Sequence, residues 1–145
     1  MLHKASRRDA ASARRLAEFH GLGLGVPRSD ATATAWFALA SDEGDLEAMV
    51  YLAASLREGL GVPCDPAAAI CVAEQAAAAG YGGAARFLGS TYDDGIGVPC
   101  DGARAADWFA RGAELGDTLS EFFLANILFD GRGVDPDPTR AVEVL

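Results

Sequence analysis

The sequence predicts an all-α protein, a right-handed α/α superhelix (solenoid) built from helical hairpins with a 36-residue period. Two observations predict this fold class. The motif G-x-G-V recurs with its first glycine at Gly23, Gly59, Gly95 and Gly131, always 36 residues apart. Half of the 145 residues are hydrophobic, and much of that half is alanine. Alanine-rich composition suits closely packed helices better than a sheet with bulky faces.

Three further columns of the sequence keep the same period, and they define the units. One column is always leucine, the next is always alanine or glycine, and the third is always glycine. These columns are Leu16, Leu52, Leu88 and Leu124; Ala17, Ala53, Gly89 and Ala125; and Gly44, Gly80 and Gly116. We therefore predict a basic tail over 1–8 and repeats over 9–44, 45–80, 81–116 and 117–145, the last one incomplete. Because small residues let helices pack closely, we expect Ala53→Leu to unfold the stack.

The first helix of each unit is indicated by apolar residues at helical spacing and by the glycines that follow. Met49, Leu52, Ser55 and Leu56 share one face at the i, i+3, i+4 spacing of an α-helix. This helix should end at the G-x-G motif, where glycine adopts the positive φ that closes a helix.

The second helix of each unit should begin at an aspartate whose carboxylate accepts the free N–H groups of the first turn. Those aspartates are Asp65, Asp101 and Asp137, and proline follows two of them at Pro66 and Pro138. One face of this helix carries Ala105, Trp108, Phe109 and Gly112. The helix should end at the glycine of the third column, with Asp45 and Asp117 capping the next first helix.

These residues resemble the Sel-1-like repeats, which are related to the tetratricopeptide repeats. The third unit carries most of the family pattern, with Ala84, Leu88, Gly89, Tyr92, Gly95, Gly97, Val98, Asp101, Ala105 and Trp108. The first unit departs from it, because Ser29 stands where the capping aspartate is expected and His20 where the tyrosine is expected. The resemblance implies a scaffold for protein–protein interactions.

Charge and hydropathy exclude several classes of function. The net charge is −9, with six Lys and Arg against two acids in residues 1–28 and six Arg against nineteen acids in the rest. Such an acidic body disfavours nucleic acid and favours a basic, or mixed basic and apolar, protein partner. No stretch is long and apolar enough to predict a membrane-spanning helix or a signal peptide. The N-terminal residues contain Arg and Ser and few acids, as a transit peptide does, but they fit the register of the repeat. We therefore expect a cytoplasmic protein. Abundant Ala, Gly and Arg suit a bacterial, GC-rich genome.

The sequence contains several further candidate motifs. GLGLG at 21–25 lacks the third glycine of a dinucleotide-binding loop, because Val26 and Arg28 follow. Cys64, Cys71 and Cys100 are expected to be reduced thiols, although a Cys64–Cys71 bond stays open. The regular cysteine pair of some cysteine-rich family members is absent. With only His3 and His20 to help, we expect no zinc site, and Asp130, Asp135 and Asp137 lack the spacing of a calcium loop.

A hydrolase is the alternative class of function, because some members of the resembled family have been labelled β-lactamases. The serine-x-x-lysine pair of such enzymes is missing, since Lys4 is the only lysine and no serine precedes it at that spacing. We therefore predict no enzyme, no catalytic residue and no cofactor. A structural spacer in a longer repeat protein is the third alternative.

A partner is expected in the concave groove, which the first helices of such a superhelix line. The positions that face away from the predicted core include an acidic set near the turns and two phenylalanines seven residues apart. The predicted groove residues are Glu47, Val50, Arg57, Glu58, Arg86, Ser90, Asp93, Asp94, Phe122, Asn126, Phe129 and Asp130. Aromatic residues beside charges are typical of binding hot spots, so the sequence predicts that this groove holds a peptide or helix of another protein.

Overall fold

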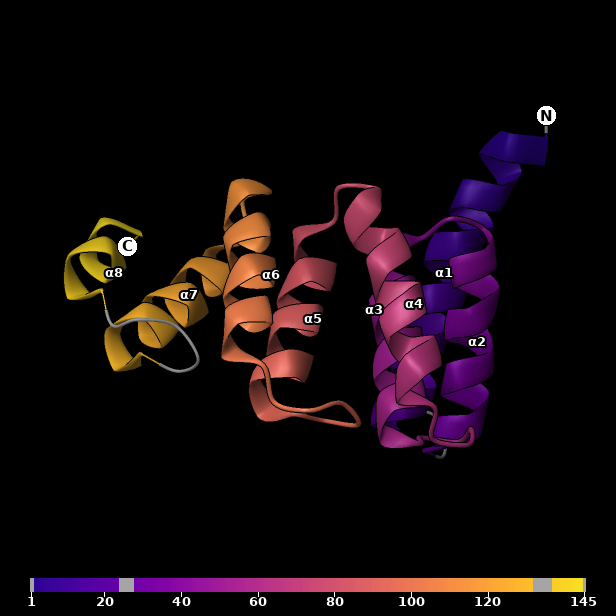
Figure 1. The fold of residues 1–145 in the computed structure, drawn as a ribbon. Helices are drawn as coiled ribbons and strands as arrows, with labels where there is room; N and C mark the ends of the chain where they lie inside the picture. Colours follow the sequence, from indigo (N-terminus) through magenta and orange to yellow (C-terminus); the bar gives the residue numbers. More distant parts are fainter. Residues whose placement is uncertain (1, 24–27, 132–136, 145) are drawn as a thin grey trace. The chain divides into compact units, whose positions relative to one another are not determined.

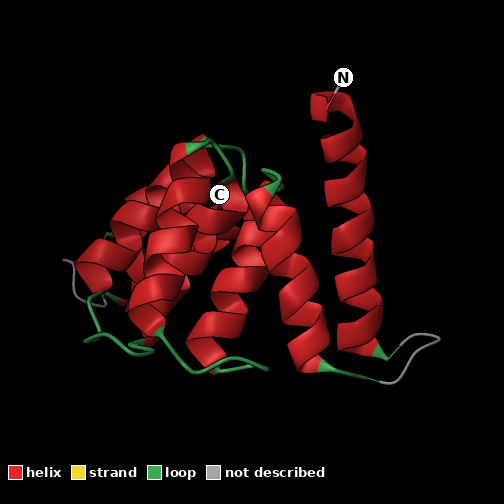
Figure 2. Ribbon diagram, turned by 90° about the vertical axis from the view of Figure 1, so that its right-hand side faces the viewer, coloured by secondary structure: helices red, strands yellow, loops and turns green. Residues whose placement is uncertain are grey.

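A computed structural model describes residues 2–23, 28–131 and 137–144. Within these ranges the chain forms eight α-helices and no strand (Figure 1). They are α1 (Leu2–Leu22), α2 (Asp30–Asp42), α3 (Leu46–Glu58), α4 (Pro66–Ala78), α5 (Gly82–Asp94), α6 (Gly102–Glu114), α7 (Thr118–Asp130) and α8 (Pro138–Val144). The prediction of an all-α chain of paired helices is confirmed, and Figure 2 shows the short loops between the helices.

The predicted capping residues begin the helices. A side-chain oxygen accepts the backbone N–H three residues further on at Ser29, Asp45, Asp65, Asp101, Asp117 and Asp137, over 2.9 to 3.2 Å. Each bond satisfies one of the N–H groups that the first turn of a helix leaves without a partner. Helix α5 differs, because Tyr81 occupies its N-cap and makes no side-chain capping bond.

The G-x-G motif serves two purposes. Its first glycine closes the helix in the left-handed conformation, with φ of +72° at Gly59 and a C-cap hydrogen bond back to Ser55. The second glycine, Gly61, has φ of +71°, and a Cβ there would overlap the backbone of Ala31 at the start of α2. Gly61 therefore lets the loop after α3 lie directly on the start of α2, the second helix of the preceding repeat. Gly25 and Val26 of the first copy of the motif lie outside the described residues.

The chain divides into two compact units, Met1–Val72 and Ala73–Leu145, with the boundary inside α4. In the first unit α1 packs against α2, and α2 packs against α3. In the second unit α5 packs against α6, α6 against α7, and α7 against α8. Each unit thus repeats the same motif of helices packed against their neighbours in sequence.

The core of the first unit is built mainly from alanine. Five alanines and Phe37 are buried together, and Trp36 and Leu52 pack against them; the alanines are Ala13, Ala17, Ala33, Ala40 and Ala48. Small side chains bring helix backbones close together, so dense packing here follows from the alanine-rich composition.

The second unit replaces part of this alanine core with larger residues. Phe109, Leu88 and Ile127 are fully buried. The small-residue column is here Gly89, and a Cβ at that position would lie 2.6 Å from the ring of Phe109. The glycine is therefore what allows the aromatic ring of α6 to lie against the backbone of α5.

Residues 2–8, predicted as a tail, continue α1, which spans 21 residues. No glycine or proline interrupts the sequence from Leu2 to His20, so nothing in this stretch ends the helix before the first unit begins.

Candidate functional site

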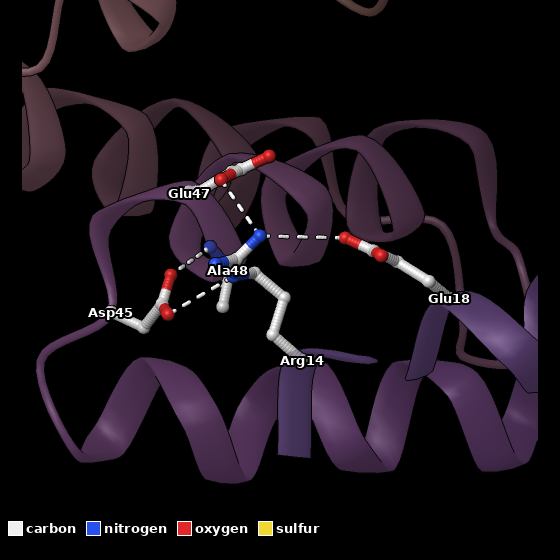
Figure 3. Close-up of polar contacts among 5 residues, drawn as sticks. All are labelled: Arg14, Glu18, Asp45, Glu47 and Ala48. Atoms are coloured by element: carbon white, nitrogen blue, oxygen red, sulfur yellow. Dashed lines mark hydrogen bonds and ion pairs between the residues drawn. The ribbon is translucent and has the colours of Figure 1, made fainter. Parts of the chain in front are cut away.

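A cluster of charged side chains joins α1 to the start of α3. Arg14 of α1 lies among three carboxylates (Figure 3), with Nε 3.1 Å from Oδ2 of Asp45 and Nη1 2.8 Å from Oε2 of Glu47. The same Nη1 atom is 3.5 Å from Oε1 of Glu18, one turn further along α1. Asp45 also caps α3 through its other oxygen, which accepts the N–H of Ala48 at 2.9 Å. Asp45 therefore begins one helix and binds the helix before it.

The electrostatics of this cluster favour a charged guanidinium. Partial burial works to lower the pKa of Arg14. The hydrogen bond that Arg14 donates to Asp45 and the charges of Asp45, Glu47 and Glu18 outweigh this effect, so the pKa is raised. One positive charge faces three negative charges. The cluster as a whole therefore carries an excess of two negative charges.

Next to this cluster, a cleft of about 470 Å³ opens among α1, α2, α3 and the loop that follows α3. Its volume lies within the range of about 300–1,000 Å³ that is typical of ligand pockets. Glu18 of the charged cluster lines it, together with the exposed aliphatic residues Leu22 and Leu60. Small residues and two aromatic rings form much of the rest, namely Ala17, Gly21, Ala33, Phe37, Tyr51 and Ala54.

The two aromatic rings of the cleft are stacked on each other. The centroids of Phe37 and Tyr51 are 4.7 Å apart and their planes are inclined by 19°. Phe37 is buried, whereas Tyr51 is 40% exposed and so reaches the solvent side of the cleft. Burial is the largest cause of the raised pKa of Tyr51, and the charges of Glu47 and Glu18 raise it further against the opposing effect of Arg14. The cleft therefore combines an apolar, aromatic lining with a negative edge.

The second unit repeats two of these contacts 72 residues further on. Nη1 of Arg86 lies 3.5 Å from Oδ1 of Asp117, the N-cap of α7, as Arg14 lies beside Asp45. Phe109 and Phe123 stack with centroids 5.2 Å apart, in the places of Phe37 and Tyr51.

Between these copies, the matching sequence positions of the ion pair hold Val50 and Tyr81. The Arg–Asp contact therefore recurs with every second repeat.

The predicted groove residues of the first unit have varied surroundings. Glu47 belongs to the Arg14 cluster. Arg57 and Glu58 form an ion pair with each other at 3.0 Å, and Val50 is half-buried on α3. None of these four lines the cleft, and their role in binding stays a prediction.

The predicted groove residues of the second unit are exposed or half-buried. Phe122 and Phe129 are 51% and 63% exposed, and Phe122 meets Phe123 edge to face with centroids 5.8 Å apart. Arg86 pairs with Asp117. The remaining members are exposed or half-buried, namely Ser90, Asp93, Asp94, Asn126 and Asp130. Their role in binding stays a prediction.

A cleft of this kind was difficult to find from the sequence. Tyr51 belongs to a column that continues as Phe87 and Phe123, which indicates an aromatic position on the first helices of three repeats. Gly21 is part of α1, although its place in GLGLG suggests only the turn that follows the helix. An open space between three helices depends on which side chains are small, and this is settled only by their packing.

The other candidate groups have structural roles or carry no site. Each thiol of Cys64 and Cys100 donates a hydrogen bond to the backbone carbonyl seven residues before it, at 3.1 and 3.0 Å, and all three cysteines are free. The backbone carbonyl of His20 accepts the N–H of Ser29 at 2.9 Å. Asp137 caps α8, while Asp135 lies outside the described residues. Among the described residues no three His, Cys, Asp or Glu side chains gather to hold a metal, and none of the helices described is long and apolar enough to cross a membrane.

Six consecutive helices of 13 residues, α2 to α7, and the packing of neighbouring helices within each unit define an α/α repeat protein of helical hairpins. The family model of the Sel1 repeat matches residues 10–45, 46–81, 83–117 and 118–143, so the chain belongs to the Sel1 repeat family. Members of this family are generally scaffolds for protein–protein interactions and are typically non-catalytic.

Two solved structures of this family are similar to the chain. A Sel1 repeat protein from Oxalobacter formigenes is 28% identical, with a TM-score of 0.80 over 93% of this chain and 55% of its own. The protein c5321, a protective antigen of uropathogenic Escherichia coli with an SLR fold, is 29% identical, with a TM-score of 0.80 over 93% of this chain and 29% of its own. The solenoid fold class is thereby confirmed, and the chain spans about half or less of these relatives. A comparison with functionally curated proteins gave no match.

Proposed function

We propose that this chain is a non-catalytic scaffold that holds a peptide segment or helix of another protein on the surface formed by its first helices. The cleft among α1, α2 and α3 carries the proposal, because it is an apolar concavity with polar groups at its edge. Such concavities are where binding proteins place the anchoring side chain of a partner. The scaffold role that is general in the family supports it.

The charge of the chain narrows the partner to a basic, or mixed basic and apolar, segment. Glu58, Asp94 and Asp130 are exposed at the ends of α3, α5 and α7, and the net charge is −9. An acidic surface raises the association rate of a basic partner and repels nucleic acid.

Selection from a phage-displayed library of short random peptides on the immobilised protein tests this function. We expect enriched peptides that cause NMR chemical-shift changes in α1 and α3 of the isotope-labelled protein. No enrichment over the unselected library, or shifts confined to α4 and α6, would contradict the proposal. Turnover of a chromogenic β-lactam by the purified protein, abolished by one Ser or Cys substitution, would favour a hydrolase instead.

Changing Glu58, Asp94 and Asp130 together to Lys should weaken the binding of the selected peptides. A structural spacer would show no enriched peptide and no effect of this reversal of charge.

A further inference from the structure

The cleft of the first unit has room for a whole side chain of a partner. Its volume of about 470 Å³ exceeds that of any one amino-acid side chain, and Phe37 and Tyr51 offer it a stacked aromatic surface. Ala17, Ala33 and Ala54 supply only methyl groups to the lining. An apolar side chain that enters this space would lose its contact with water and gain close contacts on several sides.

Gly21 is the residue that keeps one side of this space open. It lies within α1 and is not among the glycines with positive φ, so its backbone conformation is open to any residue. A Cβ at this position would make only an ordinary contact, 3.7 Å from the Cβ of Ala33. Gly21 is the last residue but one of α1, so it costs less than the about 1 kcal/mol that glycine costs relative to alanine in a helix interior. Neither backbone geometry nor crowding requires a glycine here, whereas a larger side chain would occupy the cleft.

The charges at the edge of the cleft indicate which charged group of a partner would bind beside its apolar side chain. Glu18 lines the cleft, and it shares the single charge of Arg14 with Asp45 and Glu47. The pKa of Tyr51 is raised mainly by burial and then by the negative charges of Glu47 and Glu18. Arg28 and Asp30 also line the cleft, but they pair with each other at 3.8 Å and cancel in charge. The excess of negative charge therefore lies on the side of α1 and α3.

We propose that this cleft is an anchor site for a peptide segment of another protein, in which a large apolar side chain stands next to a lysine or arginine. The apolar side chain lies over Phe37 and Tyr51, and the cation lies beside Glu18 and Glu47. This inference rests on the proposed function and adds to it the chemistry of the residue pair that is recognised. An acidic segment is disfavoured, because its carboxylates would face the excess of negative charge.

Gly21→Leu tests the anchor site, because it fills the cleft from within the chain and does not remove any contact. Leucine is also a better helix former than glycine, so the variant should unfold at a urea concentration no lower than the original protein. Ala54→Leu fills the cleft from α3 and serves as a second, independent variant. Ala35→Leu is the matched control, since Ala35 is exposed on α2 and does not line the cleft.

The three variants and the original protein are compared in the same phage selection, followed by fluorescence polarisation with one labelled synthetic peptide from it. We expect the original protein and Ala35→Leu to enrich peptides with a large apolar residue beside Lys or Arg. Gly21→Leu and Ala54→Leu should each weaken the binding of the labelled peptide by about tenfold or more. Glu18→Gln together with Glu47→Gln should weaken it by roughly threefold and reduce its sensitivity to salt.

Enriched peptides that bind Gly21→Leu and Ala54→Leu as tightly as the original protein would overturn the anchor site and leave the scaffold function in place. Peptides without the apolar and basic pair would do the same. If no peptide is enriched on any of the proteins, the anchor site and the proposed function both fail. Loss of binding by Ala35→Leu as well would show that the effect comes from added leucine and not from the cleft.

Discussion

Replacing Asp45 by alanine should destabilise the first unit more than the loss of a helix cap alone. One oxygen of Asp45 accepts the N–H of Ala48 at 2.9 Å, and the other lies 3.1 Å from Nε of Arg14. Loss of an N-cap aspartate costs about 1 kcal/mol, and loss of a partly buried ion pair about 0.5–1 kcal/mol. We therefore expect the free energy of unfolding to fall by about 1.5–2 kcal/mol.

Asp65 provides the matched control. It caps α4 by the same bond, at 3.1 Å from the N–H of Ala68, and it belongs to none of the ion pairs found in the described part of the chain. Asp65→Ala should therefore cost only about 1 kcal/mol. Urea unfolding followed by far-UV circular dichroism measures both variants.

A double-mutant cycle with Arg14→Met isolates the contribution of the ion pair. In the Arg14→Met background the cost of Asp45→Ala should fall to that of Asp65→Ala, about 1 kcal/mol. If the cost of Asp45→Ala does not change when Arg14 is absent, the assignment of a second role to Asp45 is wrong.

Four further outcomes are expected. Gly61→Ala should destabilise the protein by about 1–3 kcal/mol more than Gly44→Ala in urea unfolding, because both have positive φ but only Gly61 lies against another backbone. Gly89→Ala should lower the free energy of unfolding by about 1–3 kcal/mol, since the clash with the Phe109 ring outweighs the gain in helix propensity; a more stable variant would contradict this. The pKa of Tyr51 is raised, so the protonated phenol contributes its full stabilisation below the pKa of the unfolded state, about 10. This contribution is lost as the pH rises through the pKa of the folded state. Spectrophotometric titration should show one phenol ionising late, and Tyr51→Phe should remove that step. The three exposed cysteines should all react with a thiol reagent without denaturant, and slow reaction of any of them would speak against its exposure.

The repeat made most of the fold predictable from the sequence. A column of identical residues at one period fixes where each helix begins and ends, because capping aspartates and positive-φ glycines act locally. Asp45, Asp101 and Gly59 all have the roles that the pattern indicated. Local signals of this kind depend on few neighbours, so they can be read without knowledge of the tertiary structure.

The candidate site was less predictable, because it depends on pairs of residues far apart in sequence. Arg14 binds Asp45, which the sequence predicted only as a helix cap. The cleft exists because Gly21 and Ala54 are small where three helices meet, and no single column of the repeat indicates this. Such a site is a property of the packing between hairpins.

The Arg–Asp contact joins residues 14 and 45 and also residues 86 and 117. The equivalent positions of the repeat between them hold no such pair. Loss of a 72-residue segment from within the gene would leave an arginine of the same type opposite an aspartate of the same type. Loss of a 36-residue segment ending at residue 72 would instead bring Arg14 opposite Tyr81. The Arg–Asp contact therefore recurs at twice the period of the helix-ending glycines.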